Sequence, residues 1–200
     1  MNFLAHIYLS NSNELLTIGN FAADGVRGRN YKHFPEAMQA GIKLHREIDT
    51  FTDAHQIVRQ STKRLHKNYG HYSGVIVDIF YDHFLAKNWN KYSDIPLAEY
   101  IDTFYKSLVK NKAHLPERFK VLTPLMIKNN WLLSYATIDG IQLVLDGMNK
   151  RTNGLSKMNE ATKELKTHYT AFENDFTAFF NELIEFSNNQ LLKIEKQFNL

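Results

Sequence analysis

The fold of this chain is set by its most apolar stretch, Val75-Ile76-Val77-Asp78-Ile79-Phe80-Tyr81-Asp82-His83-Phe84-Leu85. At helical spacing its apolar side chains point in nearly every direction, so we expect a helix from about residue 72 to residue 89, buried in the core. Asp78 and Asp82 are four residues apart and share one face of that helix. A bare buried carboxylate costs several kcal/mol, so each must be hydrogen-bonded, protonated or bound to a metal.

Helical patterns continue on both sides of this stretch, and hairpin patterns are nearly absent, which predicts an all-α fold. Asn13 is placed to cap a helix that ends at the glycines at 25 and 28. Pro35 is placed to open a second helix, and Thr52 or Asp53 to cap a third. Later helices are expected from about Asp94 and Pro96, from Pro116 and from Ser134. A long C-terminal helix is expected over 157–198, with 173–175 as its weakest point and 147–159 as a loop.

Composition narrows the classes of function. With 200 residues, of which 44% are hydrophobic, the chain suits a single domain over 1–200. It contains no cysteine, so any metal must be held by His, Asp, Glu or Asn. The opening residues lack a basic leader, and no apolar run approaches the ~18 residues of a membrane span, so we expect a cytoplasmic protein without membrane contact. A net charge of +3 without a basic stripe argues against nucleic-acid binding.

A second group of acid and imidazole is the segment His45-Arg46-Glu47-Ile48-Asp49. His45 and Asp49 share a helix face, where they form either a pair of metal ligands or a helix-stabilising hydrogen bond. Arg46 could bind a phosphate through two parallel hydrogen bonds or neutralise an acidic neighbour. Both interpretations are open for each residue.

Asp24 stands near the expected end of the first helix, four residues after Asn20. An aspartate is disfavoured there by the helix dipole, which indicates either a functional role or an ion pair with Arg27 or Arg29. The choice between a metal ligand and an ordinary interior histidine is likewise open at His6, His55 and His83.

Four segments together resemble the acyl carrier protein phosphodiesterase family. They are residues 2–6 (NFLAH), 19–24 (GNFAAD), 41–55 (GIKLHREIDTFTDAH) and 78–89 (DIFYDHFLAKNW). The match covers roughly residues 1–90, and the remainder is similar only in being helical. The resemblance implies a helical fold related to the HD phosphohydrolases and a reaction that requires a divalent metal, usually manganese, with magnesium as the alternative. The substrate would be holo-acyl carrier protein, whose phosphodiester links 4′-phosphopantetheine to a serine.

Elementary chemistry agrees with that reaction. A cation that binds a phosphodiester oxygen and activates water meets the two obstacles to hydrolysis, and oxygen ligands with imidazole suit manganese or magnesium. Arg46 is expected to hold the phosphate, and His83 to protonate the leaving serine oxygen. Since Asp82-His83 reverses the His-Asp order of the HD signature, ligands cannot be transferred one by one. The expected metal ligands, direct or through water, are Asp24, His45, Asp49, Asp78 and Asp82.

Two other classes of function stay open. The chain could be an HD-like phosphohydrolase of nucleotides or other small phosphodiesters, or a noncatalytic helical binding module whose acids form structural pairs. The basic residues Arg27, Arg29 and Lys32 could guide an acidic carrier protein or form an ordinary solvated loop. The sequence does not indicate the oligomeric state.

Overall fold

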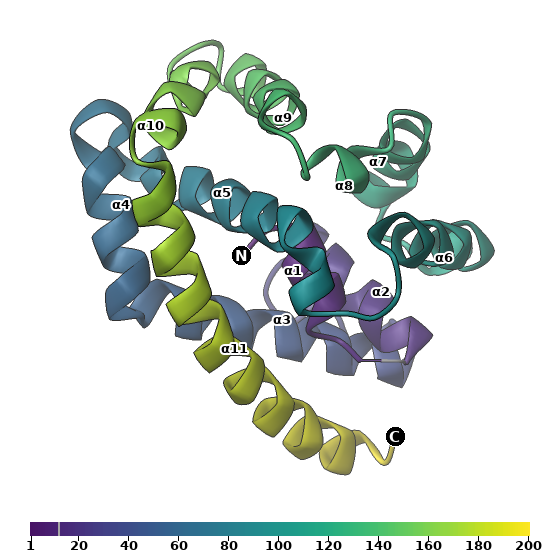
Figure 1. Cartoon of the computed structure of the whole chain (residues 1–200). Helices are drawn as coiled ribbons and strands as arrows, with labels where there is room; N and C mark the ends of the chain where they lie inside the picture. The colour runs from purple at the N-terminus through teal and green to yellow at the C-terminus, as the bar shows by residue number, and fades with distance from the viewer. Residues whose placement is uncertain (12) are drawn as a thin grey trace.

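The computed structural model describes residues 1–11 and 13–200, and within them it contains helices and no strand, which confirms the all-α prediction (Figure 1). The α-helices are α1 (Phe3–Tyr8), α2 (Glu14–Ala22), α3 (Glu36–Ala54), α4 (Gln56–Tyr69), α5 (Ser73–Lys87), α6 (Leu97–Lys110), α7 (Glu117–Lys128), α8 (Trp131–Ser134), α9 (Ile138–Arg151), α10 (Thr162–Thr167) and α11 (Tyr169–Phe198). Short 3-10 turns separate several of them, among them η1 (Ala23–Gly25). No helix of the described residues is both long enough and apolar enough to cross a membrane.

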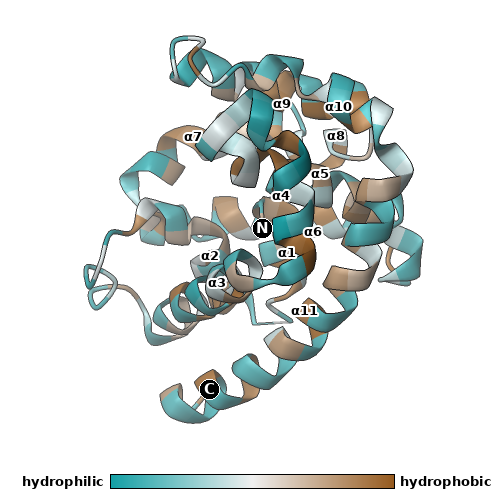
Figure 2. Ribbon diagram, turned by 90° about the vertical axis from the view of Figure 1, so that its left-hand side faces the viewer, coloured by the Kyte–Doolittle hydropathy of each residue, from teal (hydrophilic) through white to brown (hydrophobic). Residues whose placement is uncertain are grey.

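Helix α5 forms the centre of the molecule, as its apolar sequence predicts. It packs against α1, α4, α9 and α11 (Figure 1). Ile79, Phe80 and Phe84 are fully buried, and Phe80 meets Phe172 of α11 edge to face at 5.3 Å. Figure 2 shows hydrophobic and hydrophilic positions alternating along α3 and α11, as expected of helices with one buried side.

Helices α2 and α3 approach each other closely because each carries a glycine at the contact. A Cβ at Gly19 would lie 2.2 Å from the carbonyl oxygen of Met38, and one at Gly41 would lie 2.0 Å from that of Leu16. No side chain fits at either position. This contact places the main chain of α2 directly beside the side chains of α3.

The helix starts expected at Asn13, Pro35, Pro96 and Pro116 are confirmed. The start expected at Ser134 is wrong, because α8 ends there and α9 begins at Ile138 with Thr137 as its cap. The start expected at Thr52 or Asp53 is also wrong. Asn13 caps α2 by accepting a hydrogen bond from the N–H of Leu16, and Pro35 precedes α3. Thr52 and Asp53 do not cap the next helix, because α3 continues through Ala54. The side chain of His55 caps α4 instead, by accepting from the N–H of Ile57 at 3.3 Å.

The C-terminal half differs from expectation in two places. Helix α11 runs unbroken through 173–175, because the acids there accept hydrogen bonds from neighbouring elements: Asp175 from Ser61 at 2.7 Å and Glu173 from Asn88 at 2.9 Å. The break in the tail lies at His168, between α10 and α11. The expected loop at 147–159 begins only after α9 ends at Arg151.

The N-terminal helix α1 was not expected from the sequence, since it is only six residues long. Its first turn is held from outside. The carboxylate of Asp82 on α5 accepts hydrogen bonds from the main-chain N–H groups of Leu4 (2.7 Å) and Ala5 (3.1 Å). A carboxylate at a helix N-terminus satisfies unpaired donors and favours the helix dipole. Asp82 therefore stabilises α1, the helix that carries His6.

Candidate metal centre

Two histidines and one aspartate meet where α1 and α3 come together. The rings of His6 and His45 are stacked 4.0 Å apart. The Nε2 atom of His6 lies 3.3 Å from Oδ1 of Asp49, and Nε2 of His45 lies 3.1 Å from Oδ2 of the same carboxylate. All three residues can therefore direct a ligand atom at one point, with these atoms within 4.8 Å of one another.

Asn20 of α2 orients both rings. Its amide nitrogen donates to the carbonyl of His6 (2.9 Å) and to Oγ of Ser10 (2.8 Å), so its Oδ1 must face Nδ1 of His6, at 2.8 Å. Nδ1 of His45 donates to the main-chain oxygen of Asn20, also at 2.8 Å. Because Nδ1 of each ring donates to a fixed acceptor, Nε2 of each is the nitrogen left for a metal.

We expect Asn20→Ala to weaken metal affinity by about 10- to 100-fold, since a lost hydrogen-bond partner lets a ligand ring rotate or change tautomer. Calorimetric titration of the metal-free protein with Mn²⁺ measures the change. Asn68→Ala is the matched control, because the amide of Asn68 on α4 donates to Glu164 of α10, and neither residue belongs to the centre. Unchanged affinity in a correctly folded Asn20→Ala protein would contradict the orienting role.

The two histidines carry different charges. Burial opposes protonation of His45, but its hydrogen bonds with Asp24 and Asp49 outweigh burial and raise its pKa to about 9. Burial and the neighbouring charge of His45 lower the pKa of His6 to about 4. Burial would raise the pKa of Asp49, yet the hydrogen bond from the protonated His45 holds it well below its ordinary value. Near pH 7 the group is therefore an imidazolium and a neutral imidazole that share one carboxylate.

Asp24 and Asp78 lie outside this group and contact it in different ways. Asp24 lies in η1, 57% exposed, with Oδ1 3.4 Å from Nε2 of His45, and that hydrogen bond lowers its pKa. Asp78 comes from α5, with Oδ1 3.2 Å from the Met1 α-amino nitrogen, which lies 3.6 Å from Asp49. Of the expected ligands, His45 and Asp49 belong to the cluster, Asp24 contacts His45, and Asp78 is joined to Asp49 only through the Met1 amino group. Burial raises the pKa of Asp78.

Asp82 differs from the other expected ligands because both of its oxygens accept main-chain N–H groups. It is fully buried, and burial outweighs those two donors to raise its pKa to about 7. The structure gives Asp82 a positioning role toward His6, and direct ligation by Asp82 stays a prediction.

The two residues expected to act on the phosphate are engaged elsewhere. Nη2 of Arg46 donates to the carbonyl of Gly28 at 2.6 Å, and its guanidinium lies 5.2 Å from the ring centre of Tyr31. It thereby holds the segment that follows Asp24. In His83, Nδ1 donates to the carbonyl of Tyr135, and Nε2 lies 2.8 Å from the Tyr169 hydroxyl. Phosphate binding by Arg46 and proton donation by His83 stay predictions.

Of the three histidines left open by the sequence, only His6 joins the centre. His55 caps α4 and lies 3.2 Å from Glu182 of α11. No spacing in the sequence connects His6 with His45, which lies 39 positions further along the chain. The position of Asn20 four residues before Asp24 was the one local pattern that pointed to α2 as part of the site.

Comparison with known proteins gives a consistent result. The family described as "Acyl carrier protein phosphodiesterase" matches residues 1–183, so the likeness extends well beyond residue 90. A protein of that name from Pectobacterium atrosepticum is 34% identical over 146 residues, which is 72% of this chain and 76% of the relative. One from Shigella boydii is 36% identical over 147 residues, 73% of this chain and 76% of the relative. No solved structure matches the chain.

Proposed function

This chain belongs to the acyl carrier protein phosphodiesterase family, and on that premise we propose that it hydrolyses holo-acyl carrier protein with the help of a divalent metal. In the reaction, water oxygen forms a bond to phosphorus, and the bond from phosphorus to the serine oxygen breaks. The products are apo-acyl carrier protein and 4′-phosphopantetheine. The observation that carries the proposal is the convergence of His6, His45 and Asp49.

The ligand atoms of these residues lie close enough together to face one cation. The two oxygens of Asp49 lie 3.1 Å from Nε2 of His45 and 3.3 Å from Nε2 of His6, so one carboxylate would serve the ion together with both imidazoles. Nitrogen and carboxylate donors without thiolate favour Mn²⁺, with Mg²⁺ as the alternative.

The chain's own residues would divide the work. His6, His45 and Asp49 would hold the ion, and Asp24, which is more exposed, stands on the open side of the centre. A bound ion supplies Lewis acidity toward the phosphodiester and activation of water. The Met1 amino nitrogen lies 3.2 Å from Asp78 and 3.6 Å from Asp49. It thereby joins a further carboxylate, that of Asp78, to the centre.

The exposed residues Arg27, Arg29 and Lys32 follow Asp24 directly. An acidic carrier protein would be attracted to this segment, and its phosphodiester would be brought toward the metal centre.

Metal affinity should rise with pH by about tenfold per pH unit between pH 6 and 8. His45, with a pKa of about 9, must lose its proton before its Nε2 can bind a cation. His6, with a pKa of about 4, is already neutral in this range. Calorimetric titration with Mn²⁺ at several pH values should therefore show release of about one proton. A rise in affinity of about a hundredfold per pH unit, or no rise at all, would contradict this assignment of charge to the two histidines.

Intact-mass measurement of holo-acyl carrier protein tests the function. Incubation with the enzyme and Mn²⁺ should remove the mass of the phosphopantetheine group, and a chelator should prevent the loss. Retention of the full mass despite bound metal would point to another phosphodiester as substrate. Retention of the mass without any metal bound would favour a noncatalytic binding module.

A further inference from the structure

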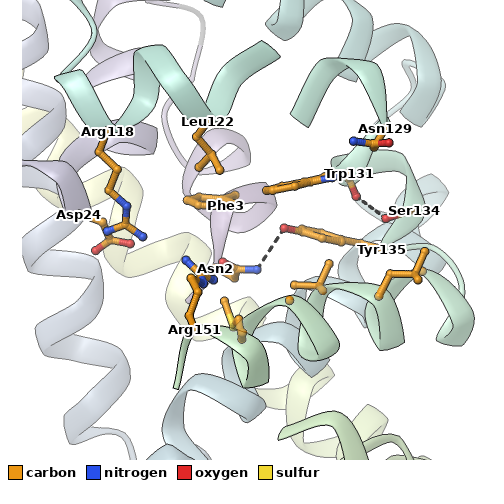
Figure 3. Close-up of a pocket in the computed structure, with 15 residues that line it drawn as sticks. Asn2, Phe3, Asp24, Arg118, Leu122, Asn129, Trp131, Ser134, Tyr135 and Arg151 are labelled. Atoms are coloured by element: carbon orange, nitrogen blue, oxygen red, sulfur yellow. Dashed lines mark hydrogen bonds between the residues drawn. The ribbon is translucent and has the colours of Figure 1, made fainter. Parts of the chain in front are cut away.

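A cavity of about 560 Å³ opens beside the metal centre, with Asp24 in the wall of both. It lies between the start of α1 and helices α7, α8 and α9 (Figure 3). Its volume is within the usual range of sites for small organic ligands. A substrate group that reaches the metal centre past Asp24 could therefore extend into this cavity.

The polar end of the cavity carries two arginines. Figure 3 shows Arg118 of α7 reaching toward the end where Asp24 lies, with Arg151 of α9 beside Asn2. Asp24 lies at the same end, but across residues 1–11 and 13–200 neither guanidinium forms an ion pair with a carboxylate. Burial and the like charge of Arg118 lower the pKa of Arg151, which indicates that the two cations are neighbours. Two neighbouring arginines, neither of them in an ion pair, are suited to a phosphate.

The rest of the cavity is mainly apolar, with Asn129 and Ser134 as its polar side chains. Figure 3 shows the rings of Trp131 and Tyr135 in its lining. Val144 and Met148 of α9 line it as well. Leu143, 72% exposed, continues this apolar surface outward along α9. The site thus offers cationic groups at one end and apolar contacts over the remainder.

We propose, on the basis of the proposed function, that this cavity binds the 4′-phosphopantetheine arm of the carrier protein. Arg118 and Arg151 hold the phosphate beside Asp24, and the apolar walls receive the methyl and methylene groups of the pantetheine chain. The arm joins a phosphate to a chain of methyl and methylene groups that also carries two amides. The cavity likewise has arginines at its Asp24 end and mainly apolar side chains, with Asn129 and Ser134, over the remainder. Recognition of the arm then lies in α7, α8 and α9, and hydrolysis lies between α1 and α3.

Gly147 provides a way to fill the cavity without disturbing the fold. It lines the cavity from within α9, and a Cβ there would meet no atom within 4 Å. Gly140, in the same helix, cannot serve, because its Cβ would lie 1.9 Å from the carbonyl oxygen of Ser134. Gly147→Phe therefore adds bulk at the cavity with no main-chain clash.

The test is calorimetric binding of two ligands, 4′-phosphopantetheine and pantetheine, to the Mn²⁺-loaded protein. Arg118→Gln and Arg151→Gln should each weaken 4′-phosphopantetheine binding by about 10- to 100-fold while leaving pantetheine binding unchanged. Gly147→Phe should weaken both ligands by at least about tenfold. Arg59→Gln and Gly74→Phe are the matched controls, since Arg59 is exposed on α4 and a Cβ at Gly74 meets no atom within 4 Å.

Binding that is equal in wild type and all three cavity variants, or absent from wild type, would overturn the assignment of the cavity. Mn²⁺ affinity is measured in each variant and should stay at the wild-type value. If wild type binds 4′-phosphopantetheine through this cavity but leaves the mass of holo-acyl carrier protein unchanged, the hydrolytic function fails and the binding site stands. If wild type hydrolyses the carrier protein and the cavity variants do so with unaltered kcat/KM, the binding site fails and the function stands.

Discussion

Asp49→Asn should lower kcat on holo-acyl carrier protein by about 10³-fold and remove most of the bound metal. The carboxylate of Asp49 serves two imidazoles at once, with one oxygen facing Nε2 of His6 and the other facing Nε2 of His45. An amide replaces one of these oxygens with an NH2 group, which cannot bind a cation. The substitution also removes the negative charge that offsets the cation in a partly buried site.

Asp53→Asn is the matched control for this substitution. Asp53 lies one turn further along α3 and is exposed, so the same chemical change is made on the same helix outside the metal centre. Turnover is measured by intact mass, metal content by elemental analysis, and helicity by circular dichroism. A folded Asp49→Asn protein with full metal content and wild-type turnover would exclude the proposed centre.

Gly41→Ala should lower the free energy of unfolding by about 3 kcal/mol, a factor of roughly 150 in the folding equilibrium. The added Cβ would lie 2.0 Å from the carbonyl oxygen of Leu16, which belongs to the main chain and cannot rotate away. Helices α2 and α3 must then move apart. Since Asn20 and His45 meet across this contact, metal affinity should fall in the same variant.

Gly147→Ala is the same change of residue at another helical glycine, and it is expected to raise stability where Gly41→Ala lowers it. Its Cβ meets open space, so replacement of a helical glycine should stabilise the protein by roughly 0.5–1 kcal/mol. Urea unfolding followed by circular dichroism measures both variants. Equal stability of Gly41→Ala and wild type would show that the close approach of α2 and α3 is not required.

Much of the local structure can be predicted from the sequence because it depends on neighbours along the chain. The caps at Asn13 and Pro35 and the burial of α5 follow from residue types at helical spacing. The pairing of His45 with Asp49 follows in the same way, since residues four apart share a helix face. The limits of the tail helix cannot be predicted in this way, because Glu173 and Asp175 accept hydrogen bonds from residues on distant elements.

The candidate metal centre as a whole is decided by tertiary structure. His6 reaches Asp49 because Asp82, from the middle of α5, holds the start of α1. The rings of His6 and His45 share Asn20 because two glycines let α2 touch α3.

The sequence by itself determined the helices, their buried faces and the pairs within one helix, because a helix repeats its geometry every 3.6 residues. Only the tertiary structure decided which faces meet. It added His6 to the centre, gave Asp82 a main-chain partner, and set Arg118 and Arg151 around one cavity. Such contacts join residues far apart in the chain, and they depend on how whole helices pack, which no local spacing records.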